Sequence, residues 1–193
     1  MNTFLIGITG EIGSGKSTVA RILSGLTDSY IGHFAEPGKR ACKVIFGLSE
    51  DDVSTQEGKS TFNEAWGMTN RDLLRVTLTD ALKPFFGADM WVKRQELALK
   101  DKEFPRCIFA DVRFPEEACW VREHGILIHV EREDNPYRVQ MSEHASDAGV
   151  PFLKGDWKVI NNGDIVELTQ RLLVIIGTTP ELRDAANNYL GAE

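Results

Sequence analysis

The apolar residues of the chain form short continuous runs that alternate with stretches of helical spacing. Between the runs, apolar residues recur three or four positions apart, as on the buried face of a helix. Leu74, Leu78, Leu82 and Phe86 are one example. This alternation predicts a three-layer α/β fold, in which helices cover both faces of a central parallel five-stranded sheet. The predicted strands are 3–9, 29–34, 106–111, 126–131 and 158–161.

Turn and capping residues predict where the helices begin and end. A proline at the first helical position and a glycine just past the last one are the main signals. Pro84 interrupts the run that starts at Thr69, so this helix is expected to kink or end near Lys83. Residues 56–68 are predicted to be irregular, and the polar stretch 133–156 is long enough to be a functional loop. The predicted helices begin near residues 16, 37, 50, 69, 88, 115, 164 and 179.

Composition and charge narrow the class of protein. The 193 residues carry a net charge of −7, which argues against a broad basic surface for polymeric nucleic acid. No apolar run approaches the roughly 20 residues that span a bilayer, so no membrane is expected as a partner. Cys42, Cys107 and Cys119 lack C-x-x-C spacing and are expected to be reduced, buried thiols. We therefore expect one cytoplasmic domain over residues 1–193.

The first predicted strand leads directly into the sequence GEIGSGKS at residues 10–17, and a predicted helix follows. A strand, G-x-x-x-x-G-K-[ST] and a helix in this order are typical of a P-loop, whereas a glycine-rich turn with a chance lysine lacks that context. Glycines let backbone N–H groups approach phosphates, and the helix start adds its positive dipole end. Lys16 would reach the β- and γ-phosphates and Ser17 would ligate Mg²⁺. The predicted ATP-binding residues here are Glu11, Gly13, Ser14, Gly15, Lys16, Ser17 and Thr18.

Further polar residues follow the other predicted strands, at the edge where parallel sheets bind ligands. Asp111 could hold Mg²⁺ through water or bind the phosphate acceptor, and Arg113 could form two hydrogen bonds to a phosphate. A surface ion pair at a strand end is the structural alternative for these two residues. Asn161 follows the last predicted strand and is counted among the ATP-binding residues.

Several arginines could contact phosphate. Arg71 and Arg75 lie one helical turn apart and could clamp an acceptor phosphate, or they could be ordinary exposed helix arginines. Arg132 and Arg138 flank the start of the long polar loop, and an arginine there could neutralise charge on a transferred phosphoryl group. His144 lies in the same loop, where a single histidine is more often incidental. Three tryptophans could stack on a base, although they are more often core residues: Trp66, Trp91 and Trp157.

Other stretches in a fixed order along the chain extend these local motifs. They are 34–39 (FAEPGK), 70–74 (NRDLL), 111–117 (DVRFPEE), 130–132 (VER) and 159–163 (VINNG). Together with the P-loop they resemble phage deoxynucleoside monophosphate kinases, within the nucleoside monophosphate kinase branch of P-loop kinases. The stretch 111–117 is the most specific of them.

This resemblance implies ATP-dependent, Mg²⁺-assisted phosphorylation of a deoxynucleoside monophosphate (dNMP) to the diphosphate. It implies that side chains around the acceptor and the transferred phosphate are Lys39, Arg71, Asp111, Arg113 and Arg132. We also expect an acceptor-binding helical region at about 35–100, a lid at about 133–156 with Arg138 and His144, and a metal site at Ser17 and Asp111. The expected catalytic residues are Lys16, Arg113 and Arg132. The expected acceptor-binding residues are Lys39, Arg71, Arg75, Trp91, Asp111 and Arg113.

Two other functions remain open at this point. One is a different small-molecule P-loop kinase, acting for example on dephospho-coenzyme A or shikimate. The other is a P-loop NTPase switch, although a GTPase should carry N-K-x-D for guanine and this sequence does not. If the resemblance holds, ATP and a dNMP are the small-molecule partners, a homodimer is a further option, and a phage-encoded protein would work in the host cytoplasm.

Overall fold

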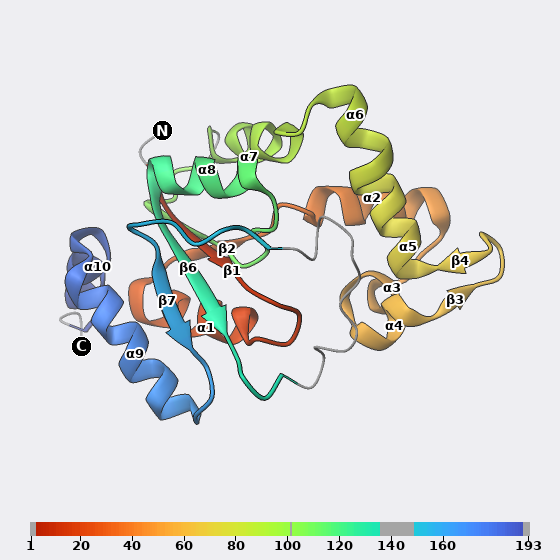
Figure 1. Ribbon diagram of the computed structural model, residues 1–193. Coiled ribbons are helices and arrows are strands. Elements are labelled where there is room, and N and C mark those ends of the chain that lie inside the picture. The colour runs from red at the N-terminus through yellow and green to blue at the C-terminus, as the bar shows by residue number, and fades with distance from the viewer. Residues whose placement is uncertain (1–2, 101, 136–148, 191–193) are drawn as a thin grey trace. The chain divides into compact units, whose positions relative to one another are not determined.

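The computed structural model describes residues 3–100, 102–135 and 149–190. The chain divides into two compact units (Figure 1). The sheet unit comprises Met1–His33 and Gln95–Glu193, and the helical unit comprises Phe34–Arg94. The division falls within helix α7 (Met90–Lys100).

The sheet unit is built on five parallel strands in the order β2-β5-β1-β6-β7. β1 lies at the centre, where Ile6 pairs with Ile108 of β5 and Ile126 of β6. All five predicted strands are confirmed, and so is their parallel arrangement. The strands are β1 (Phe4–Thr9), β2 (Tyr30–Gly32), β5 (Arg106–Phe109), β6 (Gly125–Glu131) and β7 (Trp157–Ile160).

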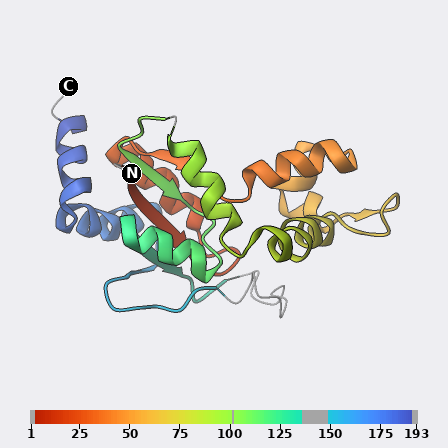
Figure 2. The same ribbon diagram turned by 90° about the horizontal axis from the view of Figure 1, so that it is seen from above.

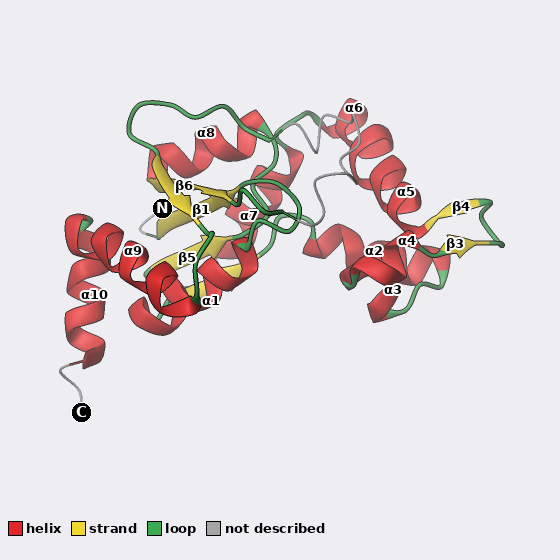
Figure 3. Ribbon diagram, turned by 60° about the horizontal axis from the view of Figure 1, so that its bottom comes forward, coloured by secondary structure: helices red, strands yellow, loops and turns green. Residues whose placement is uncertain are grey.

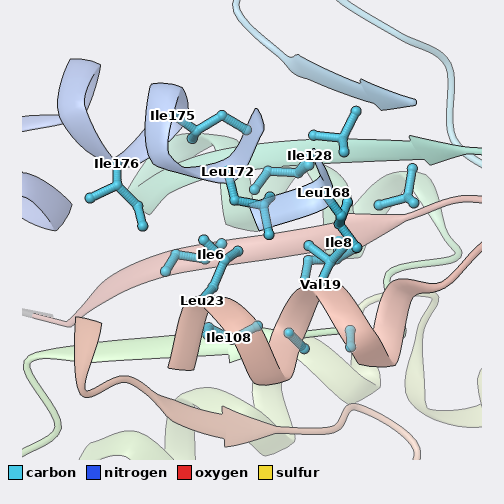
Figure 4. Close-up of a cluster of buried hydrophobic side chains, with 14 of the residues drawn as sticks. Ile6, Ile8, Val19, Leu23, Ile108, Ile128, Leu168, Leu172, Ile175 and Ile176 are labelled. Carbon is cyan, nitrogen blue, oxygen red and sulfur yellow. The ribbon is translucent and has the colours of Figure 1, made fainter. Parts of the chain in front are cut away.

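Helices cover both faces of this sheet, as Figure 2 shows from above for α1 and α8. One face packs against α1 (Lys16–Thr27) and α9 (Ile165–Thr178), through isoleucines of the central strands. Figure 4 shows this cluster, which includes Ile6, Ile8, Val19, Leu23, Ile108, Ile128, Leu168, Leu172, Ile175 and Ile176. α10 (Pro180–Leu190) follows α9 and buries Leu182 in the same cluster.

The opposite face packs against α8 (Pro115–His124). Gly7 of β1 has its Cα beneath this helix, and a Cβ there would lie 2.7 Å from Cγ1 of Val121. The helix therefore approaches the central strand at a position that only glycine can occupy without displacing it. Because strands buried on both faces need apolar residues at almost every position, the continuous apolar runs of the sequence are explained.

The helical unit contains short elements, coloured by type in Figure 3. They are α2 (Glu36–Phe46), α3 (Glu50–Ser54), α4 (Gln56–Ser60), β3 (Phe62–Asn63), β4 (Met68–Thr69), α5 (Asn70–Arg75), the π-helix η1 (Val76–Ala81) and α6 (Leu82–Phe86). The prediction that 56–68 is irregular was wrong. The Thr55 hydroxyl caps α4, and the Gly67 N–H donates to Asn63 O at 2.8 Å in the turn of the β3–β4 hairpin.

Pro84 does not end the helix, which was one of the two outcomes predicted near Lys83. The helical run does not end near Lys83 but continues to Phe86, and Gly87 then ends it with a φ of 94°. The hydrogen-bonding pattern changes one turn before the proline, where η1 adopts π-helical spacing. Since proline has no N–H to donate to the preceding turn, a change of pitch there lets the helix continue past it.

The three cysteines are free thiols that differ in burial. Cys42 and Cys107 are buried free thiols as predicted, but Cys119 is exposed on α8 because it lies on the outward side of that helix. Among the described residues, no helix combines the length and the apolar character needed to cross a bilayer.

Candidate active site

The loop between β1 and α1 has the backbone conformation of an anion-binding nest. Gly10, Gly13 and Gly15 have φ values of 145°, 79° and 99°, a region that other residues rarely adopt. A Cβ at Gly10 would collide with Val130 O, so this glycine is also required by packing. α1 has no side-chain cap at its start, in contrast to α9, where Asp164 accepts from two N–H groups. The first-turn N–H groups of α1 are thus not covered by a side-chain cap.

Lys16 lies at the centre of a cluster of charged residues. Its Nζ donates to Gly10 O at 2.7 Å and to Glu11 O at 2.6 Å. Burial, together with the positive charge of Arg113, lowers the Lys16 pKa from 10.5 to about 8, against the opposing effect of the Asp111 and Glu11 carboxylates. The structure therefore brings Lys16 and Glu11 of the P-loop together with Asp111 and Arg113, which follow β5.

Asp111 and Arg113 follow β5 on a segment that is anchored at both ends. Val112 is buried, and its N–H donates to Ile8 O at 3.3 Å. Glu117 is also buried, and its Oε2 accepts from the N–H groups of Arg113 at 2.8 Å and Phe114 at 3.2 Å. Glu117 was not among the predicted site residues, although an acid three residues after the N-cap of a helix is a known capping signal.

Two asparagine amides hold the P-loop backbone. Nδ2 of Asn161, directly after β7, donates to Ser14 O at 2.8 Å. Nδ2 of Asn135 donates to Ile12 O at 2.7 Å and to the Glu11 carboxylate at 3.2 Å. Asn161 was predicted to bind ATP, and its amide contacts the loop backbone here. Asn135 is buried and was missed, because no local motif marks it.

Four predicted acceptor-binding residues belong to the helical unit. There, Nη2 of Arg71 donates to Gln56 Oε1 at 2.8 Å, and Nη2 of Arg75 lies 3.1 Å from Asp72 Oδ1. Nε of Arg75 is buried without a hydrogen-bond partner among the described residues. Lys39 is half-buried on α2.

Trp91, the fourth, is buried in the helical unit. Its indole N–H donates to Leu78 O at 3.2 Å. A Cβ at Gly38 would lie 2.7 Å from Cη2 of Trp91, so the ring lies directly against α2. These contacts favour a packing role for Trp91 over stacking on a nucleotide base.

The predicted lid is described only at its ends. Arg132 is exposed directly after β6, whereas Arg138 and His144 lie outside the described residues. At the far end, the Asp156 carboxylate accepts from Arg122 Nε and Nη2 at 2.9 and 2.7 Å, and lies 2.9 Å from His129 Nε2. Burial alone would raise the pKa of Asp156, but hydrogen bonds from Arg122, the Leu153 N–H and His129 outweigh it and lower the pKa to about 2.

The residues predicted to hold Mg²⁺ fit a metal that is bound mainly through a substrate. Ser17 is exposed at the start of α1, and Asp111 lies close enough to Lys16 to affect its pKa. Within the described residues, no group of three or more His, Cys, Asp or Glu side chains could form a metal site. Mg²⁺ is usually bound by one or two protein ligands together with phosphate oxygens, so one hydroxyl and one carboxylate suit it.

The parallel sheet, the P-loop and the charged residues at the strand ends define a P-loop kinase. The model of the family described as "Deoxynucleotide monophosphate kinase" matches residues 47–172 of this chain. A protein of Acanthamoeba polyphaga mimivirus, provisionally named a deoxynucleotide monophosphate kinase, is 31% identical over 92% of this chain and 98% of its own. The chain belongs to the deoxynucleotide monophosphate kinase family, which confirms the resemblance seen in the sequence, and it is a kinase.

A second relative carries the same family name, and a solved structure shares the fold. The deoxynucleotide monophosphate kinase of Escherichia phage RB69 is 27% identical over 63% of this chain and 49% of its own. The crystal structure of TT1252 from Thermus thermophilus superposes with a TM-score of 0.52, at 21% identity, over 91% of this chain and 97% of that one. At that identity the superposition supports the fold only.

Proposed function

We infer that the protein transfers the γ-phosphoryl group of ATP to the phosphate of a dNMP, giving the diphosphate and ADP. One observation carries the inference: Lys16 of the P-loop interacts electrostatically with Arg113 and Asp111, which follow another strand of the sheet. A phosphate-binding loop beside a second cation and a carboxylate suits phosphoryl transfer between two anions. The family, whose members are named for dNMP phosphorylation, supports the choice of acceptor.

The reaction needs positioning and charge compensation more than proton transfer. The bond between the γ-phosphorus and the β,γ-bridging oxygen breaks, and ADP keeps its electron pair. A new bond forms between the γ-phosphorus and a phosphate oxygen of the dNMP. Lys16 and Arg113 compensate the charge on the transferred group, and Arg132, directly after β6, is assigned the same role.

Mg²⁺ would be held by Ser17 and Asp111, and when bound it would neutralise charge on the β- and γ-phosphates. Asp111 is also a candidate for acceptor binding. Lys39, Arg71 and Arg75, which all belong to the helical unit, are assigned to the acceptor phosphate. The family resemblance supports Lys39 and Arg71, and the spacing of one helical turn supports Arg71 with Arg75. Residues 35–100 are accordingly proposed as the acceptor-binding region and 133–156 as the lid of one kinase domain.

The activity can be tested with a panel of the common dNMPs and NMPs, using ATP and Mg²⁺ and following ADP release. Dephospho-coenzyme A and shikimate serve as alternative acceptors. We expect turnover with at least one dNMP, and loss of turnover on removal of Mg²⁺ with EDTA. Lys16→Met should lower the rate on the order of 10²–10³-fold, as lost charge compensation does. Turnover confined to the alternative acceptors, or ATP hydrolysis that needs no acceptor, would refute the proposal.

The role of Arg113 can be tested separately from ATP binding. Arg113→Lys keeps the charge but loses the paired hydrogen bonds that a guanidinium donates to one phosphate. We expect kcat/KM for the dNMP to fall roughly tenfold to a hundredfold, while affinity for an ATP analogue is retained. Arg183→Lys, at an exposed position on α10, is the matched control. Weaker binding of the ATP analogue with unchanged dNMP kinetics would place Arg113 on the donor side instead.

A further inference from the structure

Two side chains from distant parts of the chain bond to alternate carbonyls of the P-loop. Asn135 donates to Ile12 O and Asn161 donates to Ser14 O. The two asparagines follow β6 and β7, and they are separated from their loop partners by 123 and 147 residues. Neither contact is part of the sheet or of a helix cap, so secondary structure does not account for them.

Peptide geometry links each of these contacts to a neighbouring N–H group. In a planar trans peptide, the C=O of one residue and the N–H of the next point in opposite directions. The chain has no cis peptide among its described residues. An amide that holds Ile12 O on one side therefore directs the Gly13 N–H to the other side, and the same holds for Ser14 O and the Gly15 N–H. Within the described part of the chain, neither glycine N–H donates to a backbone carbonyl.

Lys16 extends the same pattern to the preceding peptides. Its Nζ donates to Gly10 O and Glu11 O, the carbonyls that precede the N–H groups of Glu11 and Ile12. The carbonyls of Gly10, Glu11, Ile12 and Ser14 thus accept from side-chain donors, while the Gly13 and Gly15 N–H groups stay available for an anion.

We propose that Asn135 and Asn161 are positioning residues, which hold the Ile12 and Ser14 carbonyls so that the Gly13 and Gly15 N–H groups face the phosphates. This rests on the proposed function only in that the P-loop binds a phosphate chain. Both side chains are well placed for this role. Asn135 is buried and also bonds the Glu11 carboxylate, and a Cβ on Gly15 would collide with Nδ2 of Asn161.

The role requires an amide donor at each position. Aspartate has the same shape but offers no N–H, and its charge would repel the carbonyl oxygen that the amide now holds. At position 135 the carboxylate would also lie against the Glu11 carboxylate, so the aspartate variant should be the more damaging there. Alanine removes the donor without adding a charge.

The test uses inorganic tripolyphosphate, which has the phosphate chain of ATP without its base. Its affinity is measured by calorimetry for the wild type, Asn135→Ala, Asn161→Ala, the two corresponding aspartate variants, and Asn187→Ala. Asn187 is exposed on α10 and serves as the matched control. We expect each alanine variant to bind tripolyphosphate about three- to tenfold more weakly, as for one lost hydrogen bond, and Asn187→Ala to match the wild type. KM for ATP should rise in parallel, with KM for the dNMP unchanged.

Two results would refute the role proposed for Asn135 and Asn161. If ATP binding weakens but tripolyphosphate binding does not, the asparagines contact the nucleoside and the proposal is wrong. Unchanged affinity for both ligands would also refute it. Melting temperatures without ligand identify any variant that fails to fold, and the alanine variants, which bury no charge, then decide the question. A wild type that binds tripolyphosphate but phosphorylates no dNMP would refute the proposed function alone, because the variants could still be compared.

Discussion

The lowered pKa of Lys16 predicts a pH dependence of ATP binding that an ordinary lysine would not produce. In the ligand-free protein, burial and Arg113 lower this pKa from 10.5 to about 8. A bound triphosphate adds negative charge beside the ammonium and therefore raises its pKa again. At a pH between the Lys16 pKa of the free protein and that of the complex, the complex holds more protons than the free protein. ATP binding therefore takes up a proton, and it weakens as the pH rises through 8.

The size of the effect follows from the fraction of Lys16 that is charged. If only the ammonium form binds ATP, the apparent dissociation constant scales with 1 + 10^(pH − pKa). For a pKa of about 8, raising the pH from about 7.5 to about 9 weakens binding about eightfold, and binding near pH 8 takes up about half a proton. With the ordinary value of 10.5, the same change in pH would alter the affinity hardly at all. Above pH 7.5 the phosphates themselves are fully ionised, since their last pKa is about 6.

The assay is isothermal titration calorimetry with a non-hydrolysable ATP analogue at several pH values. Repeating it near pH 8 in two buffers of different ionisation enthalpy gives the number of protons taken up. Lys16→Met should bind more weakly and without this pH dependence, whereas Lys154→Met, at an exposed position, should behave as the wild type does. An affinity that stays constant to pH 9, with no proton uptake, would refute the reasoning about the environment of Lys16.

Three further predictions concern residues that hold the site in place. Glu117→Gln should lower kcat/KM for the dNMP about three- to tenfold, because the Arg113 N–H loses its anionic acceptor, and should leave the affinity for an ATP analogue intact. If this variant has wild-type kinetics, Arg113 is held by other contacts. Since the pKa of Asp156 is held at about 2, below its ordinary 3.8, its stabilisation is present above pH 4 and is lost as pH falls through 2. Urea unfolding of Asp156→Asn should therefore show a deficit of about 2 kcal/mol at neutral pH that closes near pH 2, and equal stability at neutral pH would contradict this. Gly15→Ala should destabilise the fold by about 1–2 kcal/mol because of its positive φ, and by more because the new Cβ collides with Asn161. The double variant Gly15→Ala/Asn161→Ala should therefore lose less stability in chemical denaturation than the sum of the two single variants. Additive losses would exclude the collision.

Much of the fold could be predicted because its signals are local. A strand buried on both faces of a parallel sheet must be apolar throughout, so the five strands stand out as continuous runs. Pro37, Pro115 and Pro180 lie at or beside the first residue of their helices, where the missing N–H costs nothing.

The local signals failed in the helical unit. β3 and β4 have two residues each, which is too short for any alternation of apolar and polar residues to appear. The π-helical turn before Pro84 follows from hydrogen bonds that the backbone makes there, and the proline predicts only that the regular pattern is broken near it.

The sequence by itself determined the P-loop, because its glycines and its lysine lie within the eight residues 10–17 and the helix follows directly. It also determined that Asp111 and Arg113 follow a buried strand, and hence which edge of the sheet they occupy. Only the tertiary structure decided which side chains hold these groups in place. Asn135 and Asn161 contact the P-loop because the carboxyl ends of β6 and β7 lie at the same edge as that of β1. Contacts over more than a hundred residues depend on the order of the strands, and no spacing along the chain records that order.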